Sequence, residues 1–134
     1  MKKIKYESLN SKQKETYNYH KISAVLADYG YFTMRVTDDW ESADFIAMNC
    51  IDKSFIKVQL KGRLTFSKKY KNKELFITFE DKKTNIWYLY PHDEILNNFS
   101  KNTNRELAWD KNGEYSFPSL SKQTNMLLEQ YKLV

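Results

Sequence analysis

The nine residues FIKVQLKGR, at positions 55–63, constrain the fold more than any other stretch because apolar and polar side chains alternate along them. In a β-strand, successive side chains point to opposite faces of the sheet. Ile56, Val58 and Leu60 therefore share one face, which buries aliphatic surface. The other face collects three cations and one amide from Lys57, Gln59, Lys61 and Arg63. This polar row is either a solvated sheet face or a functional site.

A helix is predicted ahead of this strand, over residues 12–29 (KQKETYNYHKISAVLADY). Ser11 is a suitable N-cap, and Gly30 supplies a stop. Apolar side chains recur at helical spacing at Ile22, Val25, Leu26 and Tyr29.

Further short segments predict an α+β (α/β) fold. Strands are expected at 31–36, 43–49, 55–63, 74–80 and 86–90, with a turn at 38–42 and the first three strands forming a meander. Pro91 suits the start of a helix at 92–99, and a loop at 100–118 precedes a last helix around 119–132. We expect one domain over residues 1–134, with its core at about 11–99 and a loop and C-terminal helix at 100–134. Its N-terminal helix packs on a mixed, mainly antiparallel sheet of about five strands, and helices follow at the C-terminal end.

Composition excludes several classes of protein. The chain has 134 residues, of which 41% are hydrophobic and 16% aromatic, enough for one core and unlike a disordered chain. Cys50 is alone, so no intramolecular disulfide can form, and the start MKKIKYESLN lacks the apolar run of a secretory signal. No apolar stretch approaches the roughly 20 residues that span a bilayer. We expect a cytoplasmic protein without membrane contact.

Positive charge is concentrated in one part of the chain. The net charge is +5, and no acidic residue occurs between positions 54 and 73. Such a balance favours polyanion partners. The segment KKYKNK is interpreted as a phosphate-binding loop that uses Lys68, Lys69, Lys71 and Lys73. The alternative is an ordinary hairpin loop with solubilising lysines.

An acid and an amide–amine pair are expected to meet on neighbouring strands. Asp44 belongs to the second predicted strand, and Gln59 and Lys61 point the same way from the third. Carboxylate and amide oxygens are ligands that a divalent cation accepts, and a lysine beside them can steer or activate a water. An unpaired carboxylate next to the apolar run FIA would be costly, which favours a site over a turn-end aspartate.

The segments Gly30-Tyr31, WESADFIA and VQLKGR resemble the PD-(D/E)xK nuclease superfamily. In that superfamily, a helix precedes a meander bearing an acid, and then an acid or amide, one residue and a lysine. The resemblance covers residues 11–66 and implies a restriction-endonuclease-like fold. It implies Mg²⁺ or Mn²⁺ as cofactor and nucleic acid, most simply DNA, as partner.

The resemblance assigns a role to each matching position. Asp44 matches the metal-binding aspartate, Gln59 the second acid and Lys61 the lysine. Gln59 departs from the pattern, because a neutral amide removes one negative charge from the shell of the ion. Glu15 is the candidate for a compensating carboxylate, since it shares the core-facing side of the first helix with Ile22.

Three functions compete on these features. The first is a metal-dependent nuclease in which Asp44, Gln59 and Glu15 hold the ion. In this reading, Lys57, Arg63 and the lysine loop orient the backbone of the substrate, and Trp40 stacks on a base. The second is an inactive nuclease-like module that only binds nucleic acid. The third is a protein-interaction domain with a basic face. A homodimer is a further expectation, because a chain with one site cuts two strands most simply as a pair.

Overall fold

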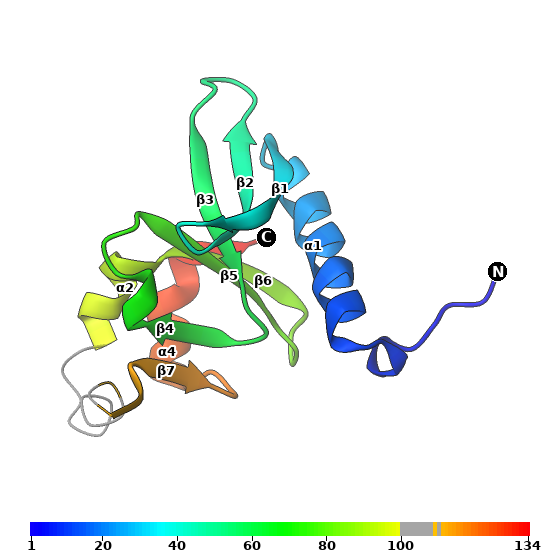
Figure 1. The fold of residues 1–134 in the computed structure, drawn as a ribbon. Helices are drawn as coiled ribbons and strands as arrows, with labels where there is room; N and C mark the ends of the chain where they lie inside the picture. The colour runs from blue at the N-terminus through cyan, green and yellow to red at the C-terminus, as the bar shows by residue number, and fades with distance from the viewer. Residues whose placement is uncertain (100–108, 110) are drawn as a thin grey trace.

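A computed structural model describes residues 1–99, 109 and 111–134. Its main sheet has six strands in the order β1-β2-β3-β5-β6-β8, and β4 and β7 form a second, two-stranded sheet (Figure 1). The strands are β1 Tyr31–Trp40, β2 Ala43–Asn49, β3 Phe55–Leu60, β4 Leu64–Ser67, β5 Leu75–Asp81, β6 Ile86–Pro91, β7 Glu114–Phe117 and β8 Lys132–Leu133. The α-helices are α1 Ser11–Ala27, α2 His92–Phe99 and α4 Lys122–Leu128, and three 3-10 turns are η1 Tyr6–Ser8, η2 Lys68–Tyr70 and η3 Glu129–Tyr131. The predicted α+β class is confirmed.

Helix α1 begins one residue earlier than predicted. Asn10, and not Ser11, is the N-cap: its side chain accepts a hydrogen bond from the Gln13 N–H at 2.9 Å, and the Gln13 side chain accepts from the Asn10 N–H at 3.0 Å. This reciprocal capping box satisfies two backbone donors that the first helical turn leaves unpaired. At the other end, Gly30 has φ +77°, a left-handed conformation that costs glycine little. The predicted stop is confirmed.

The three-strand meander is confirmed, but the predicted turn at 38–42 is wrong. Strand β1 continues to Trp40, and only Glu41 and Ser42, both with positive φ, make the two-residue turn to β2. The pairing register shifts between Arg35 and Trp40, so an irregular stretch of β1 absorbs the polar residues that had suggested a turn.

Strand pairing beyond the meander is partly parallel. β3 pairs with β5 in parallel, and the other pairs in the main sheet are antiparallel, which matches the predicted mixed, mainly antiparallel sheet. The sheet has six strands instead of about five, because β8 adds two residues beside β6. β4 and β7 were not predicted, since four residues are too few to show a periodic pattern. β7 lies within the stretch predicted as loop; residues 100–108 and 110 of that stretch lie outside the described residues.

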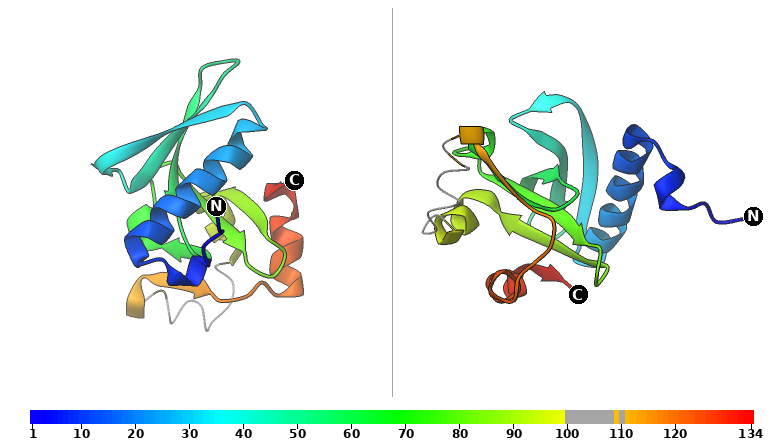
Figure 2. Two further views of the ribbon diagram at one scale, coloured as in Figure 1. Left: turned by 90° about the vertical axis from the view of Figure 1, so that its right-hand side faces the viewer. Right: turned by 90° about the horizontal axis from the view of Figure 1, so that it is seen from below.

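Two apolar clusters cover opposite faces of the main sheet. Helix α1 packs on one face over Phe45, Ala47 and Val58, and Ile56 and Leu60 join this cluster, which confirms the apolar parity of residues 55–60. The strand ends at Leu60, so its predicted continuation to Arg63 is wrong. The other cluster fills the space between β5, β6, α2 and the small sheet. Figure 2 shows α1 on one side of the sheet, and α2 and α4 apart from α1. Within the described ranges, no helix is both long and apolar enough to cross a membrane.

We predict that Asn10→Ala destabilises the protein by about 1 kcal/mol, because the capping box is lost. Urea unfolding followed by circular dichroism measures the change. Ser11→Ala is the matched control and leaves stability within about 0.5 kcal/mol, as expected for a surface residue outside such features. Equal losses in the two variants would contradict the assignment of Asn10 as the cap.

Candidate active site

Asp44 lies where β2 and β3 stop pairing. The last paired residues of the two strands at this end are Phe45 and Val58. The next β3 amide that faces β2, the N–H of Leu60, donates instead to Oδ2 of Asp44 at 2.8 Å. Ala43 and Phe45 are two residues apart, and in a regular strand their side chains would face the same side of the sheet. Ala43 instead belongs to one apolar cluster and Phe45 to the other, which indicates a twist of β2 at Asp44. The Asp44 carboxylate therefore lies against the edge of β3, beside Gln59 and Lys61.

The surroundings of Asp44 affect the pKa of its carboxyl in opposite directions. Burial raises the pKa of the Asp44 carboxyl above its usual value, and the nearby Glu15 carboxylate adds to the rise. The Leu60 N–H, the Lys61 ammonium and the Arg35 guanidinium act against that rise. A desolvated carboxylate is therefore within electrostatic range of Glu15 and Lys61, two of the residues predicted to share its site.

Gln59 and Lys61 flank the amide that binds Asp44. The Gln59 amide nitrogen lies 3.5 Å from the Leu60 carbonyl oxygen, a long contact. The Lys61 N–H donates to the Thr78 carbonyl of β5 at 2.9 Å, which fixes the backbone on the other side of β3. Both side chains are half-buried. The strand is thus held from both sides at the point where the predicted site lies.

Tyr70 joins the candidate site to the basic segment, a role that sequence analysis missed. The ring is 2% exposed, and the ammonium groups of Lys61 and Lys69 lie 5.4 and 5.2 Å from its centroid. Burial raises the pKa of the Tyr70 hydroxyl, with a smaller contribution in the same direction from Asp44. Cations over an aromatic face are attracted by its quadrupole. The lysine-rich segment after β4 therefore lies beside the end of β3.

Glu15 of α1 is exposed, so the expectation that it shares the core-facing side of the helix with the buried Ile22 is wrong; it pairs instead with Arg35. Arg35 of β1 lies 3.4 Å from the Glu15 carboxylate, 3.2 Å from Thr16 Oγ1 and 5.0 Å from the centre of the Tyr19 ring. These two charged residues line an open groove of about 640 Å³ between the start of α1 and the irregular part of β1. Sequence analysis missed Arg35, although it is the one charged residue in the stretch YFTMRV.

The resemblance to the nuclease superfamily implies a divalent cation, and the donors near Asp44 fit Mg²⁺ or Mn²⁺. Within residues 1–99, 109 and 111–134, no three His, Cys, Asp or Glu side chains gather closely enough to hold a metal ion. The available donors are the desolvated Asp44 carboxylate, the Gln59 amide oxygen and the Glu15 carboxylate. Mg²⁺ keeps several waters and is bound through one or two carboxylates together with substrate phosphate, so this small donor set suits it.

The predicted phosphate-binding lysines lie on and after η2. Lys68, Lys69 and Lys71 are exposed, and the Lys68 ammonium lies 5.8 Å from the centre of the Trp109 ring. The ammonium of Lys73, the last lysine of the segment, donates to Ser42 Oγ at 2.9 Å, in the turn before β2. This contact ties the basic segment to the hairpin that carries Asp44.

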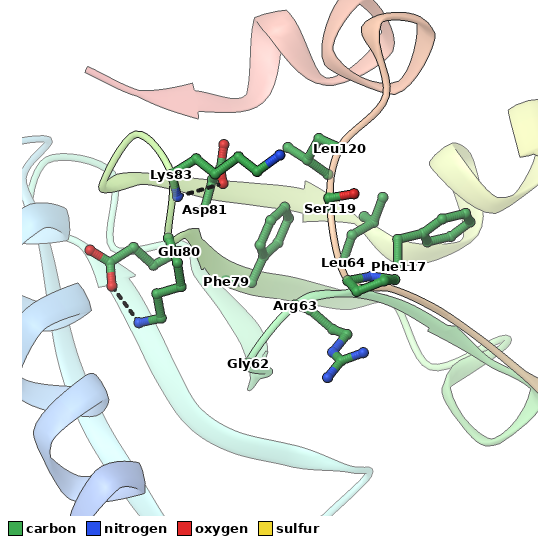
Figure 3. A pocket seen from close by; sticks show the side chains of 12 residues that line it. Gly62, Arg63, Leu64, Phe79, Glu80, Asp81, Lys83, Phe117, Ser119 and Leu120 are labelled. Atoms are coloured by element: carbon green, nitrogen blue, oxygen red, sulfur yellow. Dashed lines mark hydrogen bonds and ion pairs between the residues drawn. The ribbon is translucent and has the colours of Figure 1, made fainter. Parts of the chain in front are cut away.

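Three other predicted contact residues lie apart from this cluster. Lys57 forms an ion pair with Glu41, and its ammonium lies 5.7 Å from the centre of the Trp40 ring. Arg63 is exposed and, with Glu80 and Asp81, lines a cavity of about 60 Å³. Figure 3 shows the side chains that line this cavity. Lys57 of β3 and Trp40, the last residue of β1, therefore lie beside Glu41 of the turn after β1, and Arg63 lies in the loop after β3.

Comparisons with known proteins find likeness only at the level of structure. No protein-family model matches the chain, and no curated protein matches it. A Holliday junction resolvase from the archaeal hyperthermophile Archaeoglobus fulgidus is similar with a TM-score of 0.46 and 14% identity, over 58% of this chain and 72% of the resolvase. A bacterial homing endonuclease is similar with a TM-score of 0.47 and 13% identity, over 86% of this chain and 80% of that chain. At these values, a functional proposal rests on the geometry of the chain itself.

We predict that Asp44→Asn is at least as stable as the wild type at neutral pH. The folded state holds the Asp44 proton more tightly than the unfolded state does, so the ionised carboxylate costs stability above its folded pKa. Asparagine keeps an oxygen for the Leu60 N–H and removes the charge. As pH falls through the raised pKa, the advantage of the variant shrinks. Urea unfolding of both proteins at neutral and mildly acidic pH measures this.

Asp44→Ala is the companion variant. It removes the acceptor and leaves the Leu60 N–H without its partner, which costs about 1–3 kcal/mol. An Asp44→Asn protein as unstable as Asp44→Ala at neutral pH would contradict the description of Asp44 as a desolvated charge.

Proposed function

We propose that the protein is a nuclease of the PD-(D/E)xK type, with a restriction-endonuclease-like core, that hydrolyses phosphodiester bonds in DNA. The observation that carries this proposal is the Asp44 carboxylate, desolvated and bound to the Leu60 N–H between Gln59 and Lys61. A structural aspartate would gain more from full solvation or a direct ion pair. Keeping such a group at the end of two strands suits a site that binds a cation or a reacting phosphate.

Each residue has a role in this proposal. Asp44, Gln59 and Glu15 would hold Mg²⁺ or Mn²⁺, which when bound supplies positive charge to the phosphate as negative charge develops on it. Lys61 orients the attacking water, and its ammonium is held over the Tyr70 ring, which limits the positions it can take. Arg35 fixes the direction of the Glu15 carboxylate. The lysines after β4 bind backbone phosphates.

We predict that Asp44→Asn and Lys61→Met each lower metal-dependent cleavage by roughly a hundredfold or more, since each removes a group that acts on the water or the phosphate. Nicking of supercoiled plasmid in Mg²⁺ or Mn²⁺ measures the rate. Lys61→Met keeps most of the aliphatic stem. Lys83→Met, in the exposed turn between β5 and β6, is the matched control and cleaves like the wild type. Unchanged cleavage by either site variant would refute the assignment.

A second candidate function is nucleic-acid binding without cleavage. Two observations favour it: the second acid position holds the neutral Gln59, and the Glu15 carboxylate already has Arg35 as a partner. In that case, wild-type protein retains DNA on a filter and leaves plasmid intact. Gln59→Glu distinguishes the two functions, because restoring a carboxylate next to Asp44 would strengthen metal binding and gain cleavage in an inactive module.

We predict that DNA binding depends on Lys68, Lys69 and Lys71. Changing all three to Gln lowers the slope of log affinity against log salt by about one for each lysine that contacts a phosphate. Fluorescence anisotropy with a labelled duplex over a series of salt concentrations measures the slope. Changing Lys2, Lys3 and Lys5 to Gln is the matched control, with the same loss of charge far from β3. Equal effects in both triple variants would show only a net-charge effect.

A homodimer completes the proposal. One site per chain cuts the two strands of a duplex most simply when two copies pair about a two-fold axis. If the chain binds neither DNA nor a second copy at low salt, its basic face would instead suit an acidic protein partner.

A further inference from the structure

The face of β1, β2 and β3 that points away from α1 exposes an apolar surface. Cross-strand pairs place its side chains in one row, since Phe32 pairs with Met48, and Met48 with Phe55. Five of them, defined here as the meander patch, remain 41–65% exposed: Phe32, Met34, Trp40, Met48 and Phe55. Exposed apolar side chains on this scale mark an interaction surface.

The meander patch has a shape as well as a composition. Its five side chains, together with Thr33 and Ile46, surround a hollow of about 340 Å³. The Trp40 and Phe55 rings lie with centroids 6.4 Å apart at one side of it. A hollow of this size accepts a protruding side chain, and methionines such as Met34 and Met48 adapt their shape to a partner.

The charge near the meander patch argues against nucleic acid as its occupant. The nearest cation on β3 is Lys57, which forms an ion pair with Glu41 and lies over Trp40. A strand of nucleic acid needs cations for its phosphates as well as rings for its bases. Because Lys57 is already paired with Glu41, it offers no free cation to a phosphate and no unpaired charge to an identical copy of the chain.

The area is in the range that a dimer needs. An aromatic side chain buries about 150–250 Å² when fully covered, so five large side chains, each about half exposed, offer roughly 500 Å² per copy. Two copies would bury about 1,000 Å² from these residues alone, which reaches the lower limit of specific interfaces. Flanking residues of β1, which is an edge strand of the sheet, add to this.

We infer that the meander patch is the surface through which two copies of the chain pair about a two-fold axis. This inference assigns a face to the homodimer that completes the proposed function. Gln59 follows Phe55 by four residues on β3, about 13 Å along the strand. Each copy therefore carries its candidate site on the strands that form the contact, close to the patch.

Sedimentation equilibrium of the purified chain tests the inference without DNA or metal. The wild type is expected at twice the chain mass of 16.1 kDa in the micromolar range. Met34→Asp places one carboxylate from each copy in the apolar contact and weakens the dimer at least about tenfold. Met126→Asp is the matched control: Met126 of α4 is 72% exposed against 65% for Met34, and the dimer persists in this variant.

Two outcomes would overturn the inference: a wild-type chain that stays monomeric, or a Met34→Asp dimer as tight as the wild type. A monomer whose binding of single-stranded oligonucleotides is lost in Met34→Asp and Trp40→Ala would assign the patch to bases instead. Plasmid nicking is read separately. A dimer that never nicks plasmid overturns the proposed nuclease and keeps this interface. A monomer that nicks plasmid overturns the interface and keeps the proposed nuclease.

Discussion

The hydrogen bond from the Leu60 N–H to the Asp44 carboxylate closes one end of the sheet with a side chain. Because the neighbouring Lys61 N–H donates to β5, the Leu60 N–H faces β2, where the ladder has already ended. An unpaired amide at this depth would be costly, and a carboxylate satisfies it. The same contact holds a charge at the end of the β2–β3 pairing. Removing the charge and keeping the oxygen should therefore separate chemistry from folding.

The residues around Asp44 come from several different elements of the fold. Gln59 comes from β3, Lys61 directly follows that strand, Glu15 comes from α1 and Arg35 from β1. Tyr70 brings the lysine-rich segment against the same corner, although its ring belongs to the core. The meander patch lies farther along the same strands. The charged residues around Asp44 suit a catalytic site, and the meander patch suits the assembly of two copies.

The sequence predicted those features that repeat along the chain. The parity of residues 55–60, the meander and the end of α1 before Gly30 are all local patterns, and each is confirmed. β4, β7 and β8 are too short to show a period, and the length of β1 depends on its pairing across the Glu41–Ser42 turn. Arg35 and Tyr70 reach the candidate site only through tertiary packing, which no spacing in the sequence encodes. The catalytic roles themselves remain predictions.

The parallel pairing of β3 with β5 has a consequence for the order of folding. In the chain, β4 and η2 lie between β3 and β5. The pairing of β3 with β5 therefore requires the closure of a longer loop. The β1–β2 and β2–β3 pairings join segments that are adjacent in sequence, and such local contacts cost less chain entropy to close. Asp44, Gln59 and Leu60 all belong to this early-forming unit. The corner that holds the carboxylate is thus expected to take shape before the rest of the sheet is complete.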